Sequence, residues 1–223
     1  MLLLELFAGT HSVGRAFHAR GWEVYSLDLD PACGATWTGD VREFDPASLP
    51  RRPDLIWASP CCTQYSRART KAKTPRDLDE ADSLVLAALR IQAVCDCPML
   101  LENPHSGLLK TRDVLRGIPY AVLDYCKYHD ERCAHAARKR TAIWMVGCVF
   151  RPARPLCAKD CGHCVGNKHA ERAQQGSAPG CPTRRSLAQL HALPPLLCDE
   201  IAAWAEEVCA GPHRDHGPGE GRA

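Results

Sequence analysis

The chain has 223 residues, 45% of them hydrophobic, and a formal net charge of only +2. This length and composition predict one domain with a sizeable core, and they argue against a solenoid or a disordered chain. Because the charge is nearly balanced, affinity for a nucleic acid would have to come from local basic clusters and not from the overall field.

The cysteine content bears on the compartment in which the protein works. Fourteen cysteines would suggest disulfides in a small secreted protein. However, residues 1–5 contain no basic segment, carry an acid at the fifth position and soon reach a glycine turn, so they do not form a signal peptide. No run reaches the roughly 18 apolar residues that a membrane span needs. We therefore expect an intracellular protein in a reducing compartment, the cytoplasm or the nucleus, whose cysteines fill the core, bind metal or catalyse.

The N-terminal stretch has the pattern of a nucleotide-binding α/β unit. An apolar run over residues 2–7 predicts a buried strand, Ala8-Gly9-Thr10 breaks it, and a helical pattern follows through Val13 and Phe17. Glycine lets the backbone approach a ligand, and a new helix N-terminus offers free N–H groups. A second strand over 22–27 ends at Asp28, about 20 residues after the glycine turn, where such folds often bind ribose hydroxyls. With Asp40 further on, this order of features favours a nucleoside-containing cofactor.

A pair of thiols follows the next predicted strand, residues 54–58, which stops at Ser59-Pro60. In an open α/β sheet, ligands bind beyond the carboxyl ends of the strands, so Cys61 and Cys62 are well placed for chemistry. Five positive charges lie within residues 67–76 and would favour a thiolate. From this stretch alone, an equally good interpretation is that the two cysteines are small apolar core residues.

The middle of the chain adds an acid and a basic trio. A helix over 79–95 has a structural pattern, and a strand over 98–101 then delivers Glu102 to the same sheet edge as Cys62. Taken alone, Glu102 is an exposed strand-end acid, whereas beside a thiol it would suit proton delivery to a ring nitrogen. Residues 120–125 and 141–146 predict paired strands, and the basic residues 138–140 between them suit either a solvated face or an anion site.

These motifs, in this order, resemble those of the DNA (cytosine-5)-methyltransferases, which use S-adenosylmethionine. The resemblance covers residues 1–147 and a short C-terminal piece at 193–197 that is similar to the end of the family's last motif. Residues 4–10 resemble the first cofactor motif, and residues 54–66 align without gaps to the nucleophile motif Pro-Cys-Gln-x-Phe-Ser, with Cys62 at the nucleophile. Glu102-Asn103 matches the Glu-Asn motif, and Arg138-x-Arg140 matches the Arg-x-Arg motif.

The resemblance implies an α/β fold, namely a Rossmann-like class I methyltransferase sheet with helices on both faces. It also implies that Cys62 adds to carbon 6 of cytosine, that Glu102 acts at ring nitrogen 3, and that Arg138 and Arg140 stabilise charge near the base carbonyl. The residues implied in cofactor binding are Phe7, Ala8, Gly9, Thr10, His11, Asp28, Leu29, Asp40 and Pro60.

DNA is the partner that the resemblance implies. The target base must leave the stack to reach such a pocket, and the backbone then needs a positive surface. We expect that surface at Arg67, Arg69, Lys71 and Lys73. The segment available for target recognition is very short, so specificity is either low or supplied by a protein partner.

Several positions depart from the family pattern. A second glycine is replaced by His11, an aromatic by Leu29, the proline before the nucleophile by Cys61 and the glutamine after it by Thr63; the Gly-Asn that opens the last motif is Leu190-His191. None removes a group that performs the chemistry. Two alternatives stay open, a catalytically inactive nucleic-acid-binding relative and an RNA cytosine-5 methyltransferase.

Composition divides the chain further. We expect the catalytic domain over 1–150 and 184–209, a small irregular Cys-rich insert over 151–183, and a disordered tail over 210–223. The insert lacks periodic apolar residues, so a zinc ion could stabilise it. The candidate ligands are Cys157, Cys161, Cys164 and Cys181, with His163 and His169 nearby. The alternative is a set of scattered free thiols.

Overall fold

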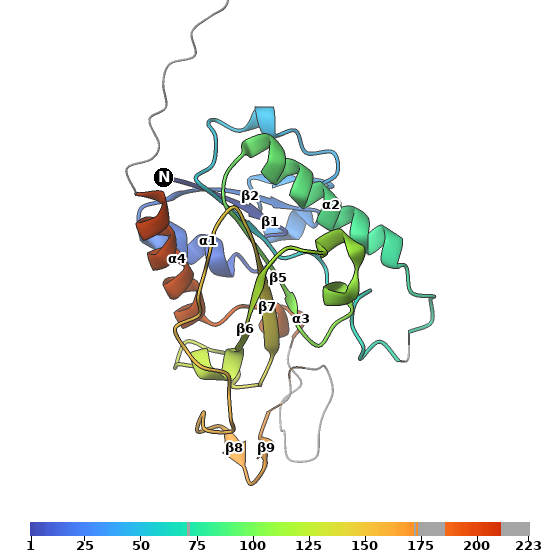
Figure 1. Cartoon of the computed structure of the whole chain (residues 1–223), viewed down its shortest axis with the longest axis vertical. Coiled ribbons are helices and arrows are strands. Elements are labelled where there is room, and N and C mark those ends of the chain that lie inside the picture. The colour runs from blue at the N-terminus through green and yellow to red at the C-terminus, as the bar shows by residue number, and fades with distance from the viewer. Residues whose placement is uncertain (71, 172, 174–185, 211–223) are drawn as a thin grey trace, which may run out of the picture.

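The computed structural model describes residues 1–70, 72–171, 173 and 186–210. Its centre is a seven-stranded sheet in the order β3-β2-β1-β4-β5-β7-β6 (Figure 1). The first five strands of this order are parallel, and β7 runs antiparallel to both of its neighbours. The strands are β1 Leu2–Leu6, β2 Glu23–Asp28, β3 Trp37–Thr38, β4 Leu55–Ala58, β5 Met99–Pro104, β6 Tyr120–Asp124 and β7 Arg140–Val146.

Helices cover both faces of the sheet. Helices α1 (Ser12–Ala19) and α4 (Pro195–Cys209) pack side by side on one face, and α2 (Leu78–Cys95) covers the other (Figure 1). Side chains of a strand alternate between faces. Leu3 accordingly packs with the α1 and α4 core, and Leu4 packs with the α2 core. The shorter helices are α3 Leu187–His191 and the 3-10 turns η1 Pro31–Cys33, η2 Pro46–Ser48, η3 Leu109–Thr111, η4 Asp113–Leu115 and η5 Tyr125–Tyr128.

This architecture confirms the predicted Rossmann-like sheet with helices on both faces. One boundary matters for the site: β5 continues past Leu101, because Glu102 and Asn103 keep pairing with β7. Glu102 is therefore held within the sheet and does not lie on a loose strand end. Within the described ranges, no helix is both long and apolar enough to cross a membrane.

The described part of the Cys-rich insert includes a small hairpin, β8 Cys164–Val165 and β9 Lys168–His169, at one end of the molecule (Figure 1). Gly166, in its two-residue turn, has a φ of 58°, a left-handed angle that glycine adopts readily. Lys71, Cys181 and the predicted tail beyond Ala210 lie outside the described residues. The division into catalytic domain, insert and tail stays a prediction.

Candidate active site

A cavity of about 350 Å³ lies at the carboxyl ends of β1, β2, β4 and β5. It has the size expected of a small-molecule site, and it lies where α/β sheets bind ligands. Ten of the residues predicted from the sequence line it: Phe7, Ala8, Gly9, Thr10, Asp28, Leu29, Asp40, Pro60, Cys62 and Glu102. The fold thus brings the predicted cofactor residues and the predicted thiol and carboxyl to one cavity.

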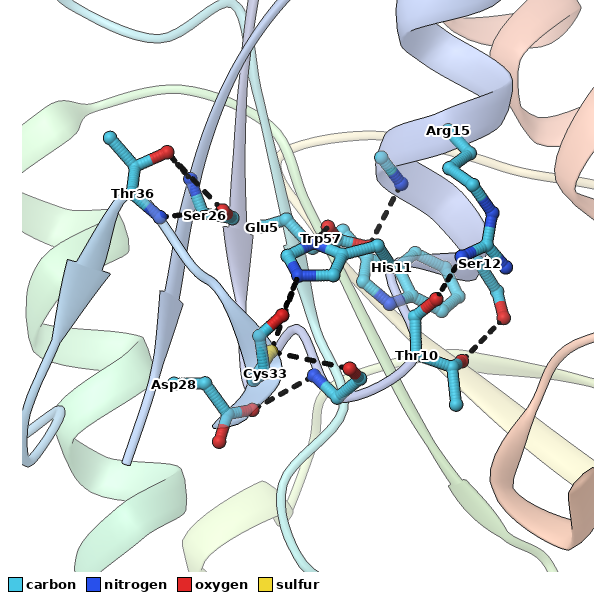
Figure 2. Close-up of polar contacts among 12 residues, drawn as sticks. Glu5, Thr10, His11, Ser12, Arg15, Ser26, Asp28, Cys33, Thr36 and Trp57 are labelled. Atoms are coloured by element: carbon cyan, nitrogen blue, oxygen red, sulfur yellow. Dashed lines mark hydrogen bonds and ion pairs between the residues drawn. The ribbon is translucent and has the colours of Figure 1, made fainter. Parts of the chain in front are cut away.

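The turn after β1 has an unusual backbone. Phe7, Gly9 and His11 all have left-handed φ angles, of 59°, 49° and 52°. Glycine adopts this region easily, but for the other two residue types it is uncommon, and such residues concentrate at ligand sites. The Gly9 N–H donates to Asp28 Oδ2 at 2.8 Å, so the turn is tied to the end of β2 (Figure 2).

His11 is the predicted cofactor residue that does not line the cavity. Its Nδ1 lies 3.3 Å from Glu5 Oε2, and its Nε2 lies 3.0 Å from the Cys33 carbonyl oxygen (Figure 2). The hydrogen bond to Glu5 raises the pKa of the imidazole. The left-handed backbone therefore directs a bulky side chain toward η1 and not into the cavity.

The cofactor end of the cavity has a donor set that fits a nucleoside. Leu29 is 70% exposed although it is apolar, and it lines the cavity beside the Asp28 carboxylate. Asp40 is hydrogen-bonded by the side chain and backbone of Arg42, which lower its pKa and keep it ionised. An exposed leucine with two nearby carboxylates suits the ring, the ribose hydroxyls and the amines of a nucleoside such as S-adenosylmethionine.

The loop that carries the thiols is held by β5. Asn103 is fully buried, and its Nδ2 donates to the Pro60 carbonyl oxygen at 2.9 Å. Cys62 follows as a half-buried residue, whereas Cys61 is exposed and its Sγ donates to Thr63 Oγ1 at 3.3 Å. The two neighbouring thiols therefore occupy different environments.

The pKa of the Cys62 thiol depends on its burial and on the charges of Lys139 and Glu102. Burial raises the pKa of the Cys62 thiol, the positive charge of Lys139 lowers it, and the negative charge of Glu102 raises it. Within the described residues, Lys139 is thus the cation identified as lowering the pKa of Cys62, whereas the sequence suggested that this charge lies within residues 67–76.

Glu102 is buried, with 5% of its surface exposed. Its Oε1 accepts hydrogen bonds from Tyr125 Oη at 3.0 Å and from Thr141 Oγ1 at 2.6 Å, and it lies 3.8 Å from Lys139 Nζ. Burial and the adjacent carboxylate raise the pKa of Tyr125, which therefore stays protonated as a donor. Among the described residues, all three of these contacts use Oε1 and none uses Oε2.

The Arg-x-Arg segment alternates between two faces. Lys139 and Thr141 point to Glu102. Arg138 and Arg140 point instead to the buried carboxylate Asp124: Arg140 binds both oxygens, at 2.9 and 2.7 Å, and Arg138 Nε lies 3.3 Å from Oδ1. Among the described residues that line the cavity, Lys139 is present and its two arginine neighbours are not.

The basic loop between β4 and α2 lies on the surface. Arg67 and Lys73 are exposed, and Arg69 donates to Thr74 Oγ1 at 2.8 Å and to the Pro75 carbonyl oxygen at 3.2 Å. Arg76 links the two ends of the loop, because its guanidinium donates a hydrogen bond to the Ser66 carbonyl oxygen at 2.9 Å. The side chains of Arg67 and Lys73 are thus accessible to a nucleic-acid backbone.

The cysteines of the insert form a different group from the one expected. Cys157 and Cys161 lie together with Cys126 and His169, and the four ligand atoms are all within 4.8 Å of one another. Cys164 lies outside this group, and Cys181 outside the described residues. From the sequence, Cys126 is a candidate ligand only in a separate group with Cys133, His129 and His135, because it lies in η5, far from the insert in sequence. Lys139 was missed because the motif names the arginines beside it; strand alternation was the signal that could have found it.

The chain is similar to known proteins both in sequence and in fold. No family model matches the chain. It is 34% identical over 158 residues to a probable DNA (cytosine-5)-methyltransferase of Frog virus 3 (isolate Goorha), an alignment that covers 65% of this chain and 70% of that protein.

Solved structures with a similar fold include the Entamoeba histolytica methyltransferase EhMeth, with a TM-score of 0.49, 13% identity and coverage of 70% of this chain and 56% of that one. The S. pombe Dnmt2 methyltransferase has a TM-score of 0.42 and 15% identity, with coverage of 65% and 50%. The chain thus spans about half the length of these solved structures. On the strength of the viral relative, the chain belongs to the DNA (cytosine-5)-methyltransferase family.

Proposed function

We propose that this chain transfers a methyl group from S-adenosylmethionine to carbon 5 of cytosine in DNA. The observation that carries the proposal is the single cavity lined both by the nucleoside-type set, Asp28, Leu29 and Asp40, and by Cys62 and Glu102. A binding protein without catalysis would not need a thiol and a buried carboxyl in contact with the cofactor cavity. The name of the viral relative supports the same reaction.

In the proposed reaction Cys62 is the nucleophile. Its thiolate forms a bond to carbon 6 of the flipped base, and the electron pair of the 5,6 double bond moves onto carbon 5. Glu102 donates a hydrogen bond or a proton to ring nitrogen 3, which makes carbon 6 more electrophilic. S-adenosylmethionine, when bound, supplies an electrophilic methyl group to carbon 5. Carbon 5 then loses its proton to a base or water, the double bond re-forms, and Cys62 leaves as a thiolate. A proton given to ring nitrogen 3 returns to Glu102 in this last step.

The cations divide into two roles in this proposal. Lys139 contacts Glu102 and lowers the pKa of Cys62, so we assign it to stabilising the thiolate and the carboxylate. Arg138 and Arg140 remain candidates for the base carbonyl, a role in which one of them would exchange part of its contact with Asp124 for the substrate.

DNA is the proposed polymer, and the basic loop is its proposed contact. Arg67, Arg69, Lys71 and Lys73 would neutralise phosphates and so make binding dependent on salt. We propose that a protein partner supplies target specificity, since the insert is short. The described cysteines form no disulfide with one another, which suits the proposed reducing intracellular compartment.

The test is incubation with radiolabelled S-adenosylmethionine and separate pools of DNA and RNA, followed by nucleoside analysis. The expected product is labelled 5-methyldeoxycytidine from the DNA pool. A DNA pool whose cytosines already carry a methyl group at carbon 5 serves as the control and should take up no label. Label in RNA alone would favour the RNA alternative. Cofactor binding without label in either pool would favour the inactive relative.

A further inference from the structure

A second cluster of reactive side chains lies outside the cavity, at the base of the Cys-rich insert. Cys157 and Cys161 come from the start of the insert, His169 from β9, and Cys126 from η5, directly after β6. Cys126 and Cys157 are 3% and 6% exposed, and His169 Nε2 lies 3.5 Å from Cys157 Sγ and 3.2 Å from Cys161 Sγ. One imidazole nitrogen and three sulfurs thus converge on one point.

The local backbone supports charged sulfurs at this point. The Lys159 N–H donates to Cys157 Sγ at 3.3 Å, and Lys159 has a left-handed φ of 73° that turns its N–H back toward the sulfur. Backbone N–H groups that donate to a ligand atom stabilise its charged form and fix its orientation. Three thiolates packed this closely would repel one another without a cation between them.

We propose that Cys126, Cys157, Cys161 and His169 bind one structural zinc ion. Three sulfurs and one imidazole nitrogen form a closed tetrahedral donor set, the kind that zinc takes at structural sites. The four ligand atoms all lie within 4.8 Å of one another. Bonds of about 2.0–2.3 Å to one tetrahedral ion would place them less than about 4 Å apart, so small side-chain movements would close the site around zinc.

The site would clip the insert to the catalytic sheet. The Cys157 N–H donates to Asp124 Oδ2 at 3.0 Å, and Lys127 Nζ lies 2.9 Å from Asp160 Oδ2, so both sides of the cluster already touch the end of β6. Asp124 is also the carboxylate that holds Arg138 and Arg140. The zinc ion therefore fixes the segment that carries the Arg-x-Arg motif, and it gives the insert the stability that its few apolar residues cannot supply.

Metal content tests the proposal directly. The full chain, purified under reducing conditions and reconstituted with zinc, should hold about one zinc per chain by elemental analysis. Cys126→Ser and His169→Gln should each lose that metal to a competing chelator that the parent protein withstands. Cys148→Ser is the matched control, because Cys148 is a half-buried cysteine outside the insert whose Sγ donates to the Met99 carbonyl oxygen, and this variant should keep its zinc.

A measurement on the unaltered protein guards against variants that fail to fold. Cobalt in place of zinc should give the visible bands of a tetrahedral ion with thiolate ligands, and zinc should make Cys126, Cys157 and Cys161 less reactive to alkylation than they are in the metal-free protein. No zinc after reconstitution would overturn the proposal. So would zinc that persists in Cys126→Ser and disappears in Cys164→Ser, since that result would give the site to the set containing Cys164 and Cys181.

Discussion

Neighbouring side chains in this protein have different tasks because strand geometry sends them to opposite faces. Lys139 reaches Glu102 at 3.8 Å, and Arg140 reaches Asp124 on the other side. On the loop after β4, Cys61 is exposed and Cys62 is half-buried, and both line the cavity. Assignment of roles within a short motif therefore depends on the face to which each residue points.

Lys139→Gln should make Cys62 less reactive at a given pH. Burial raises the pKa of Cys62 and Lys139 opposes that increase, so loss of the positive charge should raise the pKa further. The rate of Cys62 alkylation should rise with pH in both proteins, and below the pKa it should be about three- to tenfold slower in the variant. Peptide-resolved mass spectrometry across a pH series separates Cys62 from the other cysteines.

Lys110→Gln is the matched control, because it removes a lysine that does not act on Cys62, and its alkylation profile should follow that of the parent. Identical alkylation profiles of Cys62 in Lys139→Gln and in the parent would mean that Lys139 does not lower the pKa of this thiol.

At the scale of elements, β5 connects the sheet to the nucleophile loop. Asn103 is fully buried in β5 and donates to the Pro60 carbonyl oxygen, while its neighbour Glu102 faces the cavity. One strand therefore positions both the carboxyl and the loop that carries Cys62.

Asn103→Ala should release that loop. Losing the buried hydrogen bond should cost about 1–3 kcal/mol of folding free energy. It should also speed hydrogen exchange in residues 59–66 and slow methyl transfer. Asn167→Ala, in the exposed turn between β8 and β9, is the control and should leave exchange near Cys62 as it is. Faster exchange spread evenly over the whole sheet, with no excess in residues 59–66, would mean that Asn103 has only a general role in stability.

The periodic elements were readable from the sequence because each buries a regular apolar pattern. The runs over 2–7, 54–58 and 79–95 correspond to β1, β4 and α2, with no end displaced by more than one residue. The extension of β5 through Glu102 was not readable, because it depends on pairing with β7. Cys126 and His169 were not assignable as a pair either, since only the return of the insert to η5 brings them together.

Segments from both the N-terminal and the C-terminal part of the chain form the walls of the cavity. Helix α4 packs against α1, Leu193 N–H donates to Ser12 Oγ at 3.2 Å, and His191 and Leu193 line the cavity with residues of β1 and its turn. The cavity walls therefore need the C-terminal segment as well as the N-terminal half, so a truncation before α3 would open the cofactor end.

The central claim is that Cys62 forms a covalent bond with cytosine during methyl transfer, and trapping tests it most directly. DNA that contains 5-fluorocytosine has no proton to lose at carbon 5, so the enzyme cannot leave after the methyl group has been transferred. With S-adenosylmethionine present, mass spectrometry of the digested complex should find the methylated base on Cys62, with trapping absent in Cys62→Ala and retained in Cys61→Ala. A cross-link on Cys61, or trapping that survives in Cys62→Ala, would contradict the account.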